Sequence, residues 1–241
     1  MVLPGGVQIL AFLGIVAQQG QCPYKCLAVS EHVEHGVAVF IQLEPVVDLH
    51  PPGQPLKEDM DGRIDVIIDG GPCQFGVEST VLSLMGTPTI LRPGGITREM
   101  LEAVIGPVEL ASSILSPLKE GETAASPGMK YRHYAPDAEV IVATGNVKEA
   151  ASKIIELYDD KEAEGLRCTV FATEQTARFY RGKRCVIIGE RSDPATMCAN
   201  LFAMLREQKD TDVIFCEALP EQDMGLAYMN RLLRSAGFKT I

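Results

Sequence analysis

Between residues 139 and 236, four apolar, β-branched runs alternate with four stretches of helical character. The runs predict strands over residues 139–144, 167–172, 183–189 and 212–217. The stretches that follow them predict helices over residues 147–160, 173–180, 194–208 and 225–236. Strands joined through helices run parallel, so this pattern predicts a parallel sheet with crossover helices. This half contains no Gly-x-Gly-x-x-Gly, so a dinucleotide site is unsupported and a small binding or docking domain is the simplest interpretation.

The preceding part of the chain has a different pattern. Residues 64–69, 77–84 and 89–92 predict three strands, and a helix follows from the Thr97 cap to Ile105, with Gly106 as its stop. Three strands and a helix in this order indicate an α+β domain. Residues 111–125 resemble a linker in composition.

Glycines punctuate the segment Gly70-Gly-Pro-Cys-Gln-Phe-Gly-Val-Glu-Ser-Thr80, where the backbone can approach a ligand closely. If residues 77–84 alternate as a strand, Ser79 faces away from Glu78 and Thr80, and one ligand cannot contact all three. The alternative is a hairpin whose hydroxyls only bond backbone. Nothing nearby lowers the pKa of Cys73, so we treat its thiol as inert. Ser79 lacks a Gly-x-Ser-x-Gly setting and is no nucleophile candidate.

Arg92 ends a predicted strand immediately before Pro93-Gly-Gly95. A guanidinium held beside a glycine-rich turn suits a phosphate or a carboxylate. A surface ion pair with an acidic residue explains the same pattern equally well.

The stretch Ser126-Pro-Gly-Met-Lys-Tyr-Arg-His-Tyr-Ala-Pro136 is dense in aromatic and basic side chains and is bounded by proline, so we expect a loop. Aromatic rings cover apolar ligand faces and basic groups meet anions. Both a ligand-covering loop and a packed inter-domain connector fit this composition.

Bulk composition narrows the classes of function. The formal net charge of −10 argues against a broad nucleic-acid-binding face. The seven cysteines are scattered, and the histidines at 32, 35 and 50 lack a supporting acidic pattern, so no metal site is predicted. The apolar residues 7–17 are too short to span a membrane and lack a basic flank, so we expect a cytoplasmic protein.

Four separated motifs resemble the threonylcarbamoyl-AMP synthase family, the YrdC-like enzymes of tRNA modification. They are Asp61-Gly-Arg-Ile-Asp-Val-Ile-Ile-Asp-Gly-Gly71, Gly76-Val-Glu-Ser-Thr-Val81, Leu91-Arg-Pro-Gly94 and the 126–136 stretch, and residues 225–232 also fit. The resemblance implies an α/β chain: a partial YrdC-like α+β domain over residues 1–110, a linker with a substrate-covering loop over 111–137, and a small Rossmann-like parallel domain over 138–241.

The family is a nucleotidyltransferase that makes threonylcarbamoyl-AMP from L-threonine, bicarbonate and ATP, with Mg²⁺ accompanying the ATP. A downstream complex transfers the threonylcarbamoyl group to tRNA. The resemblance implies that Ser79 contacts threonine and that Arg92 and Tyr131 contact ATP. It gives no protein nucleophile, so catalysis rests on positioning and charge neutralisation. Lesser candidates share the 126–136 stretch: Lys130, Arg132, His133 and Tyr134.

Residues 1–56 depart from the family, because its Lys/Arg-rich nucleotide motif and its Pro-Ser-Ala-Asn segment are missing. Our hypothesis is a truncated start and a shifted reading frame across about residues 5–56; neighbouring DNA would then encode the missing segment in another frame. The alternative to an active enzyme is a catalytically dead remnant that binds nucleotide or threonine or serves in docking. A third function, RNA binding, is weakened by the acidic balance.

Overall fold

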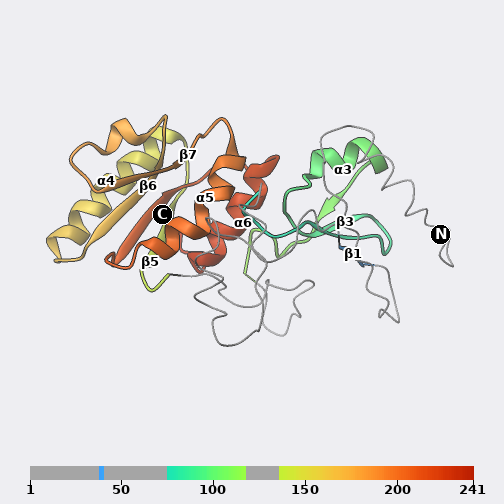
Figure 1. Ribbon diagram of the computed structural model, residues 1–241, viewed down its shortest axis with the longest axis horizontal. Coiled ribbons are helices and arrows are strands. Elements are labelled where there is room, and N and C mark those ends of the chain that lie inside the picture. The colour runs from blue at the N-terminus through green and yellow to red at the C-terminus, as the bar shows by residue number, and fades with distance from the viewer. Residues whose placement is uncertain (1–37, 41–74, 118–135) are drawn as a thin grey trace, which may run out of the picture.

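The computed structural model describes residues 38–40, 75–117 and 136–241. These residues form two four-stranded sheets, with the larger one at the left of Figure 1 and the smaller one at the right. The predicted strand over residues 64–69 lies outside the described residues.

The smaller sheet has the strand order β1-β2-β3-β4. Strand β2 pairs antiparallel with β1 and β3, and the short β4 pairs parallel with β3. A register shift between Val81 and Leu82 leaves both side chains buried, each 1% exposed. The strands are β1 (Ala38–Phe40), β2 (Val81–Ser83), β3 (Thr89–Arg92) and β4 (Glu109–Leu110).

The predicted alternation over residues 77–84 is wrong, because β2 begins only at Val81. The segment before it is held in an irregular conformation by side-chain bonds to the following turn, described below. The helix α3 (Arg98–Ile105) confirms its predicted signals: the Thr97 hydroxyl accepts a hydrogen bond from the Met100 N–H, and Gly106 ends the helix at φ 79°.

The larger sheet is parallel throughout, as predicted, with the order β5-β8-β6-β7. Strand β8 lies between β5 and β6, and all five of its residues are buried. A strand that is buried along its whole length and apolar up to its last residue, Glu217, is typical of a sheet covered on both sides. The strands are β5 (Glu139–Ala143), β6 (Cys168–Thr173), β7 (Cys185–Gly189) and β8 (Val213–Glu217).

Two hydrophobic clusters lie on opposite faces of this sheet. Helix α4 (Val147–Ala163) and the 3₁₀ turn η1 (Ala177–Tyr180) cover one face, and α5 (Pro194–Glu207) and α6 (Met224–Ser235) cover the other. Alternate residues of each strand divide between the faces: Val140 and Ile214 contact the α5/α6 side, whereas Ile141 and Phe215 contact the α4 side.

The helix predicted over residues 173–180 is wrong. Strand β6 extends to Thr173, and only η1 follows it. The Thr176 hydroxyl accepts a hydrogen bond from the Thr173 N–H at 3.0 Å and lies 2.8 Å from the Thr173 hydroxyl. These local bonds offer the backbone an alternative to a helical turn.

Helix α6 lies between the two sheets (Figure 1). Its Leu226 belongs to the core of the smaller sheet together with Leu82, Ile90 and Leu101. In the other direction, Val77, which precedes β2, belongs to the core formed by α5 and α6. Each unit therefore contributes to the core of the other.

Candidate functional site

Arg92 lies directly over Ser79. The Arg92 Nε–H donates to the Ser79 carbonyl oxygen at 3.0 Å, and Nη2–H donates to the Ser79 hydroxyl at 3.1 Å. Arg92 is 8% exposed, and Ser79 is half-buried. The two residues that the family resemblance assigns to different substrates are thus neighbours, and one guanidinium orients the hydroxyl of the other.

The turn after β3 packs against the segment that carries Ser79. The Thr80 hydroxyl donates to the Ile96 carbonyl oxygen at 2.6 Å and accepts from the Ile96 N–H at 3.1 Å. A Cβ on Gly94 would lie 2.2 Å from the Glu78 carbonyl oxygen and 2.5 Å from the Thr80 nitrogen. The close approach requires glycine, and it joins the Gly76–Val81 and Leu91–Gly94 motifs into one structure.

The three polar residues before β2 therefore have three different surroundings. Thr80 is 1% exposed and bonds only backbone among its described partners, as the simpler interpretation of the hairpin predicted. Ser79 faces Arg92. Glu78 forms an ion pair with Arg231 of α6, with 2.7 Å between Oε2 and Nε.

Helix α6 contacts both this segment and residues 113–114. Besides the Arg231 ion pair, the Asn230 side-chain amide donates to the Ile114 carbonyl oxygen at 2.5 Å. Arg234 Nη2–H donates to the Ser113 carbonyl oxygen at 2.7 Å. The sequence does not assign these roles, although Asn230 and Arg231 lie in the 225–232 stretch that resembles the family. Polar residues that repeat within an otherwise apolar helix are the signal that could have indicated them.

Burial dominates the electrostatics of this contact. Removal from water, together with the neighbouring Arg231 charge, lowers the pKa of Arg234 to about 10. The carboxylate of Glu78 is the acidic group next to the two guanidinium groups, and it favours their charged forms. The ion pair thus offsets part of the cost of holding two guanidinium groups in the interior.

The remaining sequence candidates lie outside the described residues. They comprise the thiol of Cys73, the three histidines at 32, 35 and 50, and the side chains of the 126–136 stretch, namely Lys130, Tyr131, Arg132, His133 and Tyr134. Within residues 75–117 and 136–241, no group of three His, Cys, Asp or Glu residues could hold a metal ion. No helix in the described part of the chain is long and apolar enough to cross a membrane.

The protein-family model described as threonylcarbamoyl-AMP synthase, C-terminal domain, matches residues 96–237, which are more than half of the chain. The chain belongs to the threonylcarbamoyl-AMP synthase family. The match includes α3, the whole parallel sheet and α6. The predicted resemblance to this family is thereby confirmed.

Curated relatives bear the same family name. Threonylcarbamoyl-AMP synthase of Bacillus subtilis is 41% identical over 189 residues, which cover 77% of this chain and 53% of the relative. The protein of Pyrococcus abyssi is 40% identical, and that of Schizosaccharomyces pombe is 35% identical, with 53% and 46% of their lengths covered. The chain spans about half the length of the curated relatives it matches.

Solved structures of family members share the fold. The crystal structure of P. abyssi Sua5 complexed with L-threonine matches with a TM-score of 0.69 and 38% identity, over 79% of this chain and 56% of that protein. A doubly substituted P. abyssi Sua5 matches with a TM-score of 0.69 and 36% identity, over 80% of this chain and 55% of that one. The α/β architecture predicted from the sequence is thereby confirmed.

Proposed function

We propose that the chain acts as an L-threonylcarbamoyladenylate synthase, joining L-threonine, bicarbonate and ATP for threonylcarbamoyladenosine modification of tRNA. The observation that carries this proposal is the convergence of two family motifs on one small site, where Arg92 orients the Ser79 hydroxyl. Family membership and the likeness to a threonine-bound Sua5 support the same function.

In this function Ser79 contacts the bound threonine and Arg92 contacts the nucleotide phosphates. A guanidinium favours phosphate oxygens because several N–H groups of one planar ion can meet one anion. Since Arg92 also bonds both the carbonyl and the hydroxyl of Ser79, ATP and threonine sites share a common support. Tyr131 completes the ATP site in the proposal, and Mg²⁺ enters with ATP to neutralise its phosphates.

The reaction needs positioning more than a protein nucleophile. The threonine amine and bicarbonate form a carbamate with loss of water. A carbamate oxygen then attacks the α-phosphorus of ATP, and the bond to pyrophosphate breaks. Negative charge gathers on the transferring group, so a buried cation at that position stabilises the transition state. The product passes to a complex that modifies tRNA, which makes this a cytoplasmic activity without stable nucleic-acid binding of its own.

Pyrophosphate release from ATP tests the proposal directly. We expect release that requires both L-threonine and bicarbonate, measured with the full chain in the presence of Mg²⁺. Binding of threonine or ATP without turnover would instead identify a non-catalytic remnant, which is the second candidate. Absence of both binding and turnover would contradict both functions.

The roles of the two residues are separable. Arg92→Ala should weaken ATP binding about tenfold or more, as expected for a lost contact to a charged group. Ser79→Ala should weaken threonine binding and leave ATP binding near its original value. Arg98→Ala is the matched control, because Arg98 is a surface residue of α3 paired with Glu102 and has no described contact with Ser79. Unchanged ATP affinity in Arg92→Ala would remove the phosphate role.

A further inference from the structure

At the carboxyl edge of the parallel sheet, the connections that leave two neighbouring strands show a reversal of the face that they cover. Strands β5 and β8 are paired along their whole length. The chain leaves β5 into α4 on one face of the sheet and leaves β8 into α6 on the other face. In open α/β sheets, ligands bind in the crevice that such a reversal opens beyond the strand ends.

A hollow of about 600 Å³ lies at this position. Thr144 and Gly145, which follow β5, form one wall, and Ala218 and Leu219, which follow β8, form another. Met229 of α6 lies among its apolar lining. The volume is within the range of small-molecule sites.

A buried polar network supports an arginine at this hollow. The Glu217 side chain is 2% exposed and accepts hydrogen bonds from the Tyr180 hydroxyl at 2.6 Å and the Thr176 hydroxyl at 2.9 Å. Arg191 Nη1 lies 3.5 Å from the Glu217 carboxylate, and Nη2–H donates to the Ala218 carbonyl oxygen at 2.9 Å. The Arg191 side chain, 21% exposed, lines the hollow.

Burial of the Glu217 carboxylate has a free-energy cost that a structural role alone does not explain. Burial raises the pKa of Glu217, while its hydroxyl partners and Arg191 act in the opposite direction. Burying an ionised carboxylate is unfavourable unless it is fully paired, and apolar residues of equal volume would stabilise the sheet equally well. Fixing a guanidinium at the wall of a crevice is what this arrangement accomplishes, as supporting groups do at binding sites.

The polar groups of the hollow favour a single carboxylate. The N-terminal N–H groups of α4 are already engaged by its own capping box, formed by Asn146 and Glu149, so this helix does not provide a phosphate cradle. Glu221 adds a carboxylate to the lining and disfavours polyanions. The apolar wall matches an apolar body, and besides Met229 and Leu219 it includes Leu115, Leu233 and Phe238.

We propose that the crevice between the ends of β5 and β8 binds a small monocarboxylate with an apolar body, whose carboxylate meets Arg191. This site is separate from the Ser79–Arg92 site and does not depend on the synthase activity. Organic acids and apolar amino acids share this chemistry. Amino acids have an additional ammonium group, which can donate a hydrogen bond to the Glu221 carboxylate.

Methionine methyl NMR of the full chain tests the site, with the Met229 signal assigned through Met229→Leu. The probes are 4-methylpentanoate and L-leucine, which differ only in the amino group. We expect at least one of them to shift the Met229 methyl signal saturably at millimolar concentrations. Tighter binding of L-leucine would identify amino acids as the ligand class, and tighter binding of 4-methylpentanoate would identify organic acids. AMP, a phosphate monoester, is expected to leave the signal unchanged.

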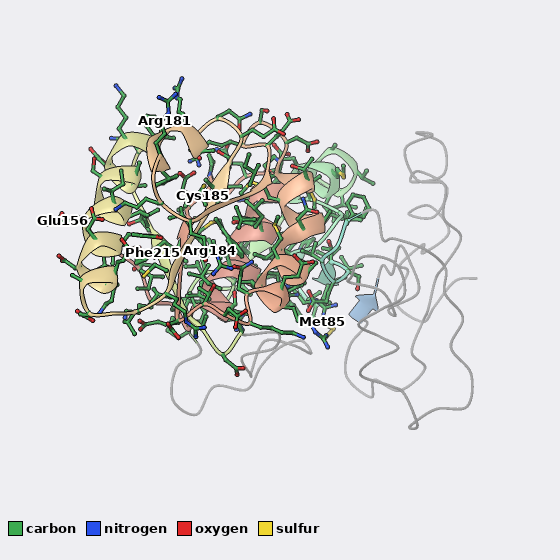
Figure 2. All side chains as sticks on the ribbon, turned by 60° about the vertical axis from the view of Figure 1, so that its left-hand side comes forward. Met85, Glu156, Arg181, Arg184, Cys185 and Phe215 are labelled. Carbon is green, nitrogen blue, oxygen red and sulfur yellow. The ribbon has the colours of Figure 1, made fainter. Side chains whose placement is uncertain are left out.

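Two variants and a control decide whether Arg191 carries the binding. Arg191→Gln should weaken binding of the probe at least tenfold, whereas Arg181→Gln should not, because Arg181 projects outward on the surface (Figure 2) and is not among the residues that line the hollow. Ala218→Leu fills the hollow without changing a charge and should also abolish the shift, provided the other methionine signals stay dispersed. The proposal is overturned if neither carboxylate shifts the signal, if AMP alone does, or if Arg191→Gln binds as tightly as the original chain.

Discussion

The two sheets differ in whether the residues that pack against them come from the same stretch of chain. The parallel sheet is covered on one face by α4 and η1 and on the other by α5 and α6, all from the same stretch of chain. The smaller sheet has α3 from its own stretch but takes Leu226 of α6 into its core, and its Gly76 lies against Ala199 of α5. The C-terminal domain is therefore part of the structure that shapes the Ser79 segment, rather than an appendage joined by a linker.

This difference predicts that damage at the contact between the units harms the smaller sheet more than the parallel one. The contact has a polar part, in which α6 holds Glu78 and the carbonyl groups of Ser113 and Ile114. It also has an apolar part around Val77 and Leu226. Substitutions at the contact should therefore have larger effects on stability than substitutions within the smaller sheet, and those within the parallel sheet should have the smallest effects.

Arg231→Met should cause the largest loss of stability. Arg231 is 4% exposed, and its loss leaves the Glu78 carboxylate, 17% exposed, without its ion-pair partner. Breaking such a pair costs about 3 kcal/mol. Hydrogen exchange should then show roughly 100-fold less protection in β2 and β3 and little change in β6 and β8.

Adding Glu78→Gln to Arg231→Met is the control, because removing the unpaired charge should restore part of the lost protection. Equal loss of protection in both sheets would mean that they unfold as one cooperative unit. The distinction between a self-supported and a dependent sheet would then be wrong.

Gly94→Ala should have the next largest effect, confined to the smaller sheet. The new Cβ would lie 2.2 Å from the Glu78 carbonyl oxygen, a backbone atom that cannot move aside without displacing Ser79. We expect a loss of about 2–3 kcal/mol in urea unfolding and a weakened threonine affinity. Gly86→Ala is the matched control: its Cβ would meet nothing within 4 Å, and only the positive φ of 76° adds a cost of about 1 kcal/mol. A larger loss at Gly86 would show that the close approach at Gly94 is unimportant.

Sequence patterns predicted the regular parts of this chain and missed the contacts between them. Apolar runs specified the parallel sheet, and the Thr97 and Gly106 signals specified the ends of α3, because those effects act over a few residues. The strand over residues 89–92 was also predicted, and Arg92 ends it. The orientation of Ser79 was missed because Thr80 bonds Ile96 and delays the start of β2. The Glu78–Arg231 pair joins distant parts of the sequence, which no local pattern reveals.

Tyr180→Phe tests the parallel sheet itself. The Tyr180 hydroxyl donates to the Glu217 carboxylate at 2.6 Å, and its removal leaves a buried carboxylate with one donor fewer. We expect the free energy of unfolding to fall by about 2 kcal/mol, which is typical of a lost hydrogen bond to a charged group. Because the pKa of Glu217 is raised above 4.5, its folded form binds protons more tightly, so the loss should shrink as the pH falls through the raised pKa toward 4.5.

Phe179→Leu is a suitable comparison for Tyr180→Phe, since it alters an adjacent, partly buried ring without touching Glu217. Urea midpoints measured between pH 5 and pH 8 would separate the two. A destabilisation by Tyr180→Phe that does not vary between pH 5 and pH 8 would show that Glu217 keeps one protonation state over this range, contrary to the expectation.

Asp212→Asn should cause a smaller loss of stability than the changes above, because its ion-pair partner, Arg167, lies on the surface. The Arg167 guanidinium, 57% exposed, and the Arg167 N–H bond the Asp212 carboxylate and lower its pKa from 3.8 to about 2. A folded-state pKa below the unfolded value contributes stability that is present above about pH 4 and is lost as the pH falls toward 2. The variant should therefore be slightly less stable than the original chain at neutral pH, and the difference should vanish in acid. Asp210→Asn, whose carboxylate lies 3.6 Å from the same guanidinium and is 89% exposed, should change stability still less. If high salt leaves the Asp212→Asn difference unchanged, the hydrogen bond to the Arg167 N–H, rather than the ion pair, stabilises this end of the parallel sheet.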